Sequence, residues 1–568
     1  MNLNKINLVY YLLVIILPLL VITFSANYNF IDSSNYFFKT LFSGEFFNMY
    51  AKNWPYYNPI THENRFQPFV GISQNIILFF DTIKSEKSIY WVQFIIFTIA
   101  LFFAILSTNK NHLSIYLVYL IFVSSPPFIF SFFQPLLTET ALLFFFSIYI
   151  FLLKNLLFNI TKVNSILIIL LLPIIILSKI SSILLLIPLN FFLILFFILK
   201  KNTFYALFFS FCFCISLLSH YLLVSYTGSP PDKLYNPTKF FYLYANTDYI
   251  IIYLYLVCLT SIFINDFNIE KLTYYTFLNI SLLITSILYF IALIIFGKHS
   301  EYQQVICYFL LIPYLVNIKL RNNLFKNLTF VILISLISLP IIYNKDFFKL
   351  IILFILLILF TNLIIKIFKF KYNVNYISLI LVILSIFYLI IPGISLSFHR
   401  YQIGKNIEFV INNIDKKNIN TSTEIFIHST NNDNCSASIM HNFIFNERLS
   451  FVLKKNYKLY VNPIINNQEC KEDLRYFEEN YSKVNKNYFE NFKNNYVHYE
   501  PDIIISHFYN DIKNFNNFII DQNINIQNYD LFEYKYNYIW NRFYKISSTI
   551  SAFEYKTPVV FLLKRKIN

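Results

Sequence analysis

The chain has 568 residues, of which 57% are hydrophobic and 13% charged, and its mean hydropathy is +0.55. A soluble protein of this length does not need so much apolar surface, and recurring apolar runs of about 17–25 residues indicate membrane spans. The net charge of +15 would suggest nucleic acid as the partner of a soluble protein. Much of the excess positive charge of this chain lies in short connections between apolar runs, where Lys and Arg set the orientation of a membrane protein. We therefore expect a polytopic α-helical membrane protein in contact with lipids, without a nucleic-acid partner.

The apolar runs predict about thirteen transmembrane helices. They fall at 7–24, 89–107, 113–131, 137–153, 164–178, 181–199, 204–225, 249–265, 273–296, 303–318, 327–343, 349–368 and 376–397. Pro126 and Pro127 interrupt the third run. No small-residue cleavage site follows the first run, so we expect a retained helix and not a signal peptide.

The short connections on the side of the N-terminus hold more Lys and Arg than those on the opposite side. The positive-inside rule then predicts a cytoplasmic N-terminus, most simply in a bacterial inner membrane. With an odd number of spans, the first loop (25–88) and the segment after residue 398 lie together on the periplasmic or extracellular side. The expected division is a transmembrane domain at 1–398 and an extracytoplasmic domain at 399–568.

The first loop is long for a connection in a polytopic protein, which suggests a function. It contains Asp32, Glu45 and a group formed by His62, Glu63 and Arg65, followed by a short amphipathic run at 69–80. That run is too short to span a bilayer and suits its surface. We interpret this loop as half of an active site.

Beyond residue 398 the apolar runs become short, at 424–429, 458–463, 502–508, 517–523 and 559–565, and polar residues separate them. Such runs predict strands, and 471–492 has helical character, so a small α/β domain is expected. Cys435 and Cys470 are a candidate disulfide on an oxidising face. The sequence leaves open whether these two thiols come close enough to pair.

Several ionisable residues stand at the outer ends of predicted spans, where they are costly and their default interpretation is functional, with a partner nearby. These residues are Glu139, Lys179, Asp232, His299 and Glu301, to be joined by Asp32 and Arg65 of the first loop. Each one taken alone also suits a helix end in headgroup water. Their occurrence on the side that carries the long loop favours a common site.

Such a set can transfer a group from a lipid-linked phosphate. The carboxylate of Asp32 can take a proton from an acceptor hydroxyl or hold a divalent cation, Mg²⁺ or Mn²⁺, and no other cofactor is expected. Arg65 suits bidentate phosphate binding, while Lys179 and His299 suit single contacts. No Walker loop, GxSxG, HExxH or dinucleotide motif is present, which removes ATP-driven transport and the common hydrolases.

The order of these parts resembles the GT-C class of membrane glycosyltransferases, which use polyprenyl-phosphate sugars. The matching segments are NFIDSSNYFF around Asp32, NRFQPFVGISQNIILFF at 64–80, LLTETALLFF around Glu139, LSKISSILLLIP around Lys179, and HSEYQQVICYFLLIPYL at 299–315. Two positions depart from the pattern of the class. Ser33 stands where many members have a second acid, which leaves Asp32 as the candidate base or metal ligand, with Glu45 or Glu63 assisting. Tyr302 follows Glu301 without the arginine of the late motif, which shifts phosphate binding to Arg65, Lys179 or His299.

The resemblance implies an inverting transfer of a sugar from a polyprenyl-phosphate donor to a glycan, lipid or protein acceptor at the outer face. Asp32 would be the catalytic residue, and Glu139 and Asp232 would assist or bind the acceptor, with Glu301 and Tyr302. An O-antigen-type polymerase or ligase is one alternative, although its large loop usually comes late in the chain. A non-enzymatic flippase or transporter is another, and it typically has internal repeats and charges near the midplane.

Overall fold

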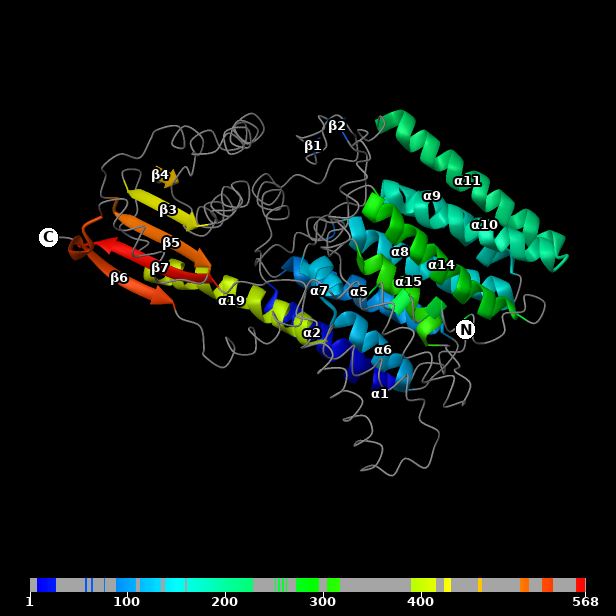
Figure 1. Ribbon diagram of the computed structural model, residues 1–568, viewed down its shortest axis with the longest axis horizontal. Coiled ribbons are helices and arrows are strands. Elements are labelled where there is room, and N and C mark those ends of the chain that lie inside the picture. Colours follow the sequence, from blue (N-terminus) through cyan, green and yellow to red (C-terminus); the bar gives the residue numbers. More distant parts are fainter. Residues whose placement is uncertain are drawn as a thin grey trace, which may run out of the picture.

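The computed structural model describes residues 8–26, 57–58, 63–64, 76, 88–108, 113–133, 138–158, 161–227, 251, 254–255, 258–259, 262, 272–295, 304–316, 390–414, 423–430, 458–461, 501–509, 524–534 and 558–566. In this part, the helices form a bundle and most of the strands form one sheet, with a single long helix, α19, reaching from the bundle to the sheet (Figure 1).

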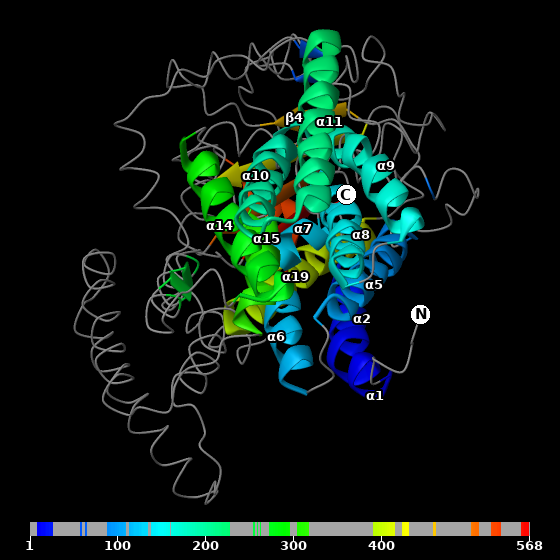
Figure 2. The ribbon, with the colours of Figure 1, turned by 90° about the vertical axis from the view of Figure 1, so that its right-hand side faces the viewer.

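The helices follow the predicted apolar runs closely. Their bounds are α1 Leu8–Tyr11, the π-helical η2 Leu12–Ile16, α2 Leu17–Ser25, α5 Ser88–Leu106, α6 Leu113–Val123, α7 Pro126–Phe133, α8 Thr138–Phe158, α9 Lys162–Ser178, the 3-10 helix η4 Ile180–Ser182, α10 Ile183–Leu199, α11 Thr203–Thr227, α14 Tyr274–Ile295, α15 Val305–Leu315 and α19 Ile391–Asn413. In the view turned by 90° from Figure 1, α1 and α2 lie beside α5 and α6 (Figure 2).

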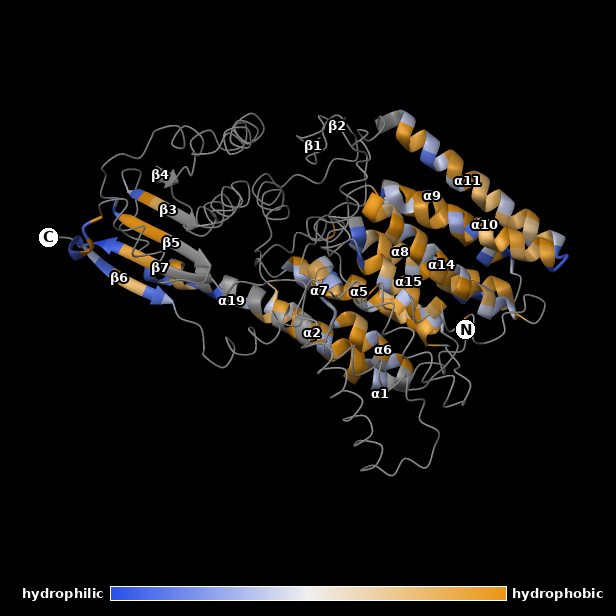
Figure 3. Cartoon of the chain, viewed as in Figure 1, coloured by the Kyte–Doolittle hydropathy of each residue, from blue (hydrophilic) through white to orange (hydrophobic). Residues whose placement is uncertain are grey.

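Four of the described helices are long and apolar enough to cross a membrane, at Ser88–Leu106, Glu139–Phe158, Thr203–Ser225 and Tyr274–Ile295. Shorter apolar helices pack among them (Figure 3). These helices indicate a membrane-embedded protein. The predicted spans at 327–343 and 349–368, and most of 249–265 and 376–397, lie outside the described residues, so the number thirteen stays a prediction.

The outer faces of the bundle are apolar. On α11, Leu207 is 71% exposed and Tyr221 68%, and on α9 Val163 is 65% exposed. An exposed apolar surface of this kind fits contact with lipid chains rather than with water. The helix backbones satisfy their own hydrogen bonds, as a spanning segment requires.

The prolines after Val123 end α6 as predicted, and the chain resumes as α7 after Ser124 and Ser125. This link is where α19 approaches the bundle. A Cβ atom on Gly393 would overlap the carbonyl oxygen of Ser124, so the close approach requires glycine. The hydroxyl groups of Ser25 and Ser397 lie 2.6 Å apart and join α2 to α19.

Polar side chains at one end of the bundle cap the last carbonyl groups of α5. The Lys154 ammonium donates to the Leu106 carbonyl at 2.9 Å and lies 5.4 Å from the ring centre of Tyr275, whose hydroxyl donates to the Thr108 carbonyl at 2.7 Å. A helix leaves its last carbonyls without intrahelical donors, so these bonds stabilise its end. The predicted span ended at residue 153, just before Lys154, but α8 continues to Phe158 and Lys154 is buried.

Among the described residues, the larger sheet has five strands in the order β4-β3-β5-β7-β6. The strands are β3 Glu424–Thr430, β4 Lys458–Val461, β5 Ile503–Tyr509, β6 Tyr529–Tyr534 and β7 Pro558–Arg565. β3 pairs in parallel with β4 and β5, whereas β7 is antiparallel to β5 and β6. Four predicted strands are thus confirmed, and β6 was not predicted. The strand at 517–523, the helix at 471–492 and both Cys435 and Cys470 lie outside the described residues.

Helix α19 runs through the predicted domain boundary at residue 398 and packs against β7. The rings of Phe409 on α19 and Tyr534 on β6 lie 5.4 Å apart. One continuous helix therefore ties the sheet to the bundle.

Candidate functional site

Two of the predicted site residues, Glu139 and Lys179, are described with their side chains. Glu63 is placed by its backbone only, in the short strand β2 (Glu63–Asn64), which pairs antiparallel with β1 (Tyr57–Asn58). The remaining predicted residues lie outside the described part of the chain: Asp32, Glu45, Arg65, Asp232, His299, Glu301 and Tyr302. Their roles stay predictions.

Glu139 and Lys179 form an ion pair. Glu139 lies in the first turn of α8, where the helix dipole favours a negative charge. Lys179 has an extended backbone, with φ −159° and ψ 124°, and separates the end of α9 from η4. This backbone turn allows the side chain of Lys179 to reach the start of the neighbouring helix. The sequence predicted both residues at one depth on one face, and the structure brings their charges into contact.

The pair is removed from solvent. Glu139 is 2% exposed and Lys179 is 8% exposed. Removing two charges from water costs several kcal/mol per ion. The attraction between the charges offsets this cost only if their geometry is good. Such a pair is weak evidence for stability, which makes it a candidate for a functional role.

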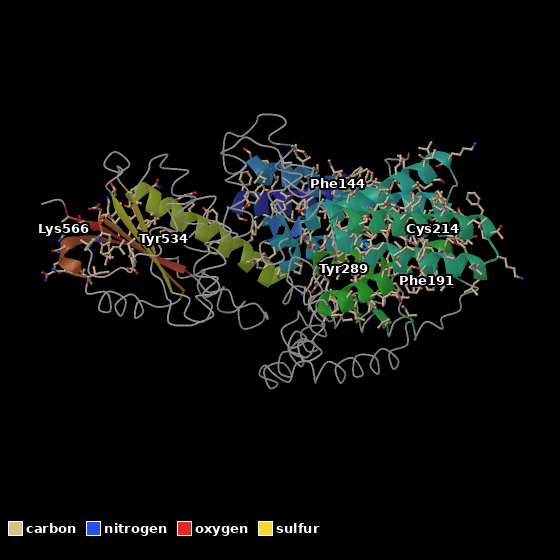
Figure 4. The ribbon with its side chains drawn as sticks, turned by 90° about the horizontal axis from the view of Figure 1, so that it is seen from above. Phe144, Phe191, Cys214, Tyr289, Tyr534 and Lys566 are labelled. Carbon is tan, nitrogen blue, oxygen red and sulfur yellow. The ribbon has the colours of Figure 1, made fainter. Side chains whose placement is uncertain are left out.

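Hydroxyl groups of η4, which follows Lys179 in the chain, lie close to α14. The Tyr289 hydroxyl lies 3.4 Å from that of Ser181 and interacts electrostatically with both charges of the pair. Figure 4 places Tyr289 within the helical part. The hydroxyls of Ser182 and Thr285 are buried without a hydrogen-bond partner among the described residues.

A second chain of hydrogen bonds continues from α14 to α15. The hydroxyls of Tyr255 and Ser286 lie 2.7 Å apart, and the Ser286 hydroxyl donates to the carbonyl of Cys307 at 2.7 Å. On the other side of the pair, the Gln93 amide donates to the Thr140 hydroxyl at 3.4 Å. Polar contacts thus link α5, α8, α14 and α15 at this level of the bundle.

The pair lies at the end of the bundle where the first loop begins and ends. The rings of Phe24 and Trp91 lie 5.4 Å apart, which puts the end of α2 beside the start of α5. The bond from Gln93 to Thr140 puts the start of α5 beside the start of α8. Segment 27–87 therefore departs from and returns to the face that holds Glu139.

Three lysines of the described residues lie at the opposite end of the bundle. Lys200 and Lys201 join α10 to α11, where Phe196 stacks on Phe277 at 3.9 Å, and Lys154 contacts Tyr275 near the start of α14. Tyr289 is fourteen positions further along α14 than Tyr275, or ~21 Å at 1.5 Å per residue. Among the described residues, lysines thus gather at the end of the bundle opposite to the pair of Glu139 and Lys179.

The chain matches no protein-family model, and no curated protein sequence matches it. Among the described residues, no group of three or more His, Cys, Asp or Glu side chains could hold a metal ion. Asp32, the predicted ligand of a divalent cation, lies outside them. Sequence reasoning missed Tyr289, Ser181 and Ser182; the serines stand next to Lys179 in the sequence, while nothing distinguishes Tyr289 among 45 tyrosines.

Proposed function

We propose that the protein is a membrane glycosyltransferase that moves a sugar from a polyprenyl-phosphate donor to a glycan, lipid or protein acceptor at the outer face of a bacterial inner membrane. The observation that carries the proposal is the buried pair of Glu139 and Lys179, at the bundle end where segment 27–87 departs and returns. The lysine-rich opposite end supports a cytoplasmic location for that end.

In this proposal, Lys179 helps to hold the donor phosphate. An ammonium group has three N–H donors, so it can hold a carboxylate and a phosphate together. Glu139 fixes the position of the Lys179 ammonium group. The hydroxyls of Ser182, three residues after Lys179, and of Thr285, four residues before Tyr289 on α14, are buried groups without a partner among the described residues that a polar headgroup could use.

The reaction would be a single displacement. The acceptor oxygen attacks the anomeric carbon of the sugar, the bond from that carbon to the phosphate oxygen breaks, and polyprenyl phosphate leaves with its electron pair. Asp32 accepts the proton of the acceptor hydroxyl, and Arg65 and Lys179 stabilise the charge that develops on the leaving phosphate. His299 is a further candidate for a phosphate contact. Inversion at the anomeric carbon follows from one displacement.

The test is a transfer assay in nanodiscs with a panel of radiolabelled polyprenyl-phosphate sugars and membrane-extracted acceptors. The wild type should transfer label to an acceptor or to water, and Asp32→Ala should lower the rate by about 10²–10⁴. Glu408→Gln, at an exposed residue of α19, is the matched control and should keep the wild-type rate. Equal turnover by Asp32→Ala would move the chemistry out of the first loop. Absence of turnover with every donor, while native mass spectrometry shows bound polyprenyl lipid, would instead favour a flippase.

A further inference from the structure

Buried polar atoms without a hydrogen-bond partner concentrate on two neighbouring helices of the bundle. Of the nine such atoms among the described residues, five belong to η4, α10 and α14. They are the hydroxyls of Ser182, Ser281 and Thr285 and the amide nitrogens of Asn190 and Asn279, and each of these residues is at most 3% exposed. α10 and α14 pack side by side, so the five groups lie in one region of the bundle (Figure 2).

Two contacts fix how α10 and α14 lie against each other. At the end that holds Lys179, the hydroxyls of Ser181 and Tyr289 lie 3.4 Å apart. At the opposite end, the ring of Phe196 stacks on that of Phe277, with the ring centres 3.9 Å apart. The residue numbers rise along α10 between these contacts and fall along α14, so the two helices are antiparallel and positions between the contacts can be compared by level.

The partnerless groups follow one another from the level of Tyr289 into the bundle. Thr285 and Ser281 precede Tyr289 by four and eight positions, so they lie on the same side of α14 and ~6 and ~12 Å deeper. Asn190 follows Ser181 by nine positions, or ~13 Å, which is about the level of Ser281. The row therefore extends over about two turns of each helix.

These groups need partners that the lipid cannot supply. A buried hydroxyl or amide without a partner costs a large share of a protein's marginal stability, and five of them would cost about as much as the whole free energy of unfolding. Lipid chains carry no hydrogen-bonding groups. Buried water molecules typically bond polar groups that otherwise lack partners. Pro188 adds an acceptor within the row, because it has no N–H for the carbonyl of Leu184, four positions earlier in α10.

The row approaches solvent at Lys179. The side chain of Lys179 is 10% exposed, whereas Ser182, Thr285 and Ser281 are 0% exposed. Tyr289, at the head of the row on α14, interacts electrostatically with Lys179. At the deep end, the Tyr149 hydroxyl donates to the side-chain oxygen of Asn190 at 3.4 Å, so that α8 adjoins the row there. One end of the row is therefore close to solvent and the other lies among packed helices.

We propose that water molecules occupy the interface of α10 and α14 and form a path that opens beside Lys179 and ends near Asn190. Water on this path bonds the hydroxyls of Ser182, Thr285 and Ser281, and at its opening it hydrates the ammonium group of Lys179. A charged pair can then stay inside the bundle without full loss of hydration. The proposal does not depend on the transfer reaction.

The test measures whether thiols placed on this path meet water. Thr285→Cys and, separately, Ser281→Cys are made in the full chain in nanodiscs and treated with 2-aminoethyl methanethiosulfonate. This reagent reacts with the thiolate form, which an apolar environment suppresses. Mass spectrometry of peptides from quenched samples compares the label at the substituted position with the label at Cys258 of the same molecule, a native cysteine that is 0% exposed.

We expect both substituted positions to react at least tenfold faster than Cys258, and position 285, nearer to Lys179, to react faster than position 281. The path is overturned if either folded variant reacts there no faster than Cys258. Faster reaction at 281 than at 285 would overturn the opening beside Lys179. A thermal melt establishes folding, and Ser281→Cys, which replaces one oxygen atom by sulfur, decides the result if Thr285→Cys does not fold.

Thr285→Val gives a second readout without an added thiol, because it removes the hydroxyl and nearly keeps the volume. If water bonds this hydroxyl, its loss should lower the melting temperature. In a dry interface the hydroxyl is an unsatisfied buried group, so its removal should raise the melting temperature. A rise would overturn the proposal.

Discussion

The ammonium group of Lys179 contacts the carboxylate of Glu139 across 40 positions of sequence, and both side chains are buried. α8 and α9 are antiparallel neighbours, so the start of one helix and the end of the other lie at the same level. The helical hairpin of α8 and α9 thus brings the two charges together. Because both are buried, the loss of one of them should change the free energy of unfolding measurably.

Glu139→Gln should destabilise the protein strongly, because it leaves the ammonium of Lys179 buried without its carboxylate. The expected loss is about 3–5 kcal/mol in the free energy of unfolding. The double variant Glu139→Gln/Lys179→Met should recover most of that loss, since neither buried charge then remains. Thermal or denaturant unfolding in detergent measures both.

The matched control for this pair is the exposed ion pair between Lys405 and Glu408 on α19, at 38% and 47% side-chain exposure. Its loss in Glu408→Gln should cost below about 1 kcal/mol. If Glu139→Gln and Glu408→Gln lowered the free energy of unfolding equally, the result would contradict the burial of Glu139 and Lys179.

Gly393→Ala should lower the melting temperature, although alanine is the better helix former by about 1 kcal/mol. The added Cβ would overlap the Ser124 carbonyl oxygen and push α19 away from the link between α6 and α7. Overpacking of this kind costs about 1–3 kcal/mol. Ile394→Ala, at a 44% exposed neighbour, is the comparison. A rise in melting temperature for Gly393→Ala would show that α19 does not approach so closely.

Tyr275→Phe should destabilise the end of α5 that lies far from the site. Its hydroxyl donates to the carbonyl of Thr108, a buried residue, and a buried polar group that loses its partner costs about 1–3 kcal/mol. The neighbouring Tyr274→Phe removes a hydroxyl that makes no hydrogen bond among the described residues, so it should be near neutral. Hydrogen exchange of the last turn of α5 would report the difference, and similar protection in both variants would argue against the bond.

The contact between α19 and β6 should weaken above about pH 10. The hydrogen bond to Glu408 raises the pKa of Lys405, and burial raises the pKa of Tyr534. Both groups bind their protons more tightly in the folded protein, so their contribution is complete below the unfolded pKa values and is lost as pH rises through the folded ones. The wild type should therefore lose more melting temperature than Tyr534→Phe between pH 9 and 11. An equal loss in both proteins would remove Tyr534 from this effect.

Apolar patterning predicted the described helices of the bundle, because most of them are apolar runs with polar residues at their ends. The same reasoning singled out Glu139 and Lys179, since charges at the edge of a membrane are costly and need partners. The same reasoning could not identify Tyr289. Its contact with Ser181 depends on where α14 lies relative to η4, and the sequence around Tyr289 carries no motif that indicates it.

Other features could not be predicted from the sequence, because they depend on contacts with distant parts of the chain. β6 reads YDLFEY, with Asp530 and Glu533 interrupting any apolar run, and only its pairing with β7 makes it a strand. The contact of Ser25 with Ser397 joins residues 372 positions apart, and Gly393 gives no sign of the carbonyl that it meets. These contacts depend on how α19 docks, which periodicity does not specify.

The most direct measurement is the rate of sugar transfer from the polyprenyl-phosphate donor that the wild type uses, by the double variant Glu139→Gln/Lys179→Met. This variant removes both charges without leaving either one buried alone, so a folded protein is expected, and a thermal melt verifies it. The proposed function predicts that transfer falls by about 10²–10³ while folding is retained. A folded double variant that transfers sugar at the wild-type rate would contradict a role for this pair in the reaction and would leave it a structural contact.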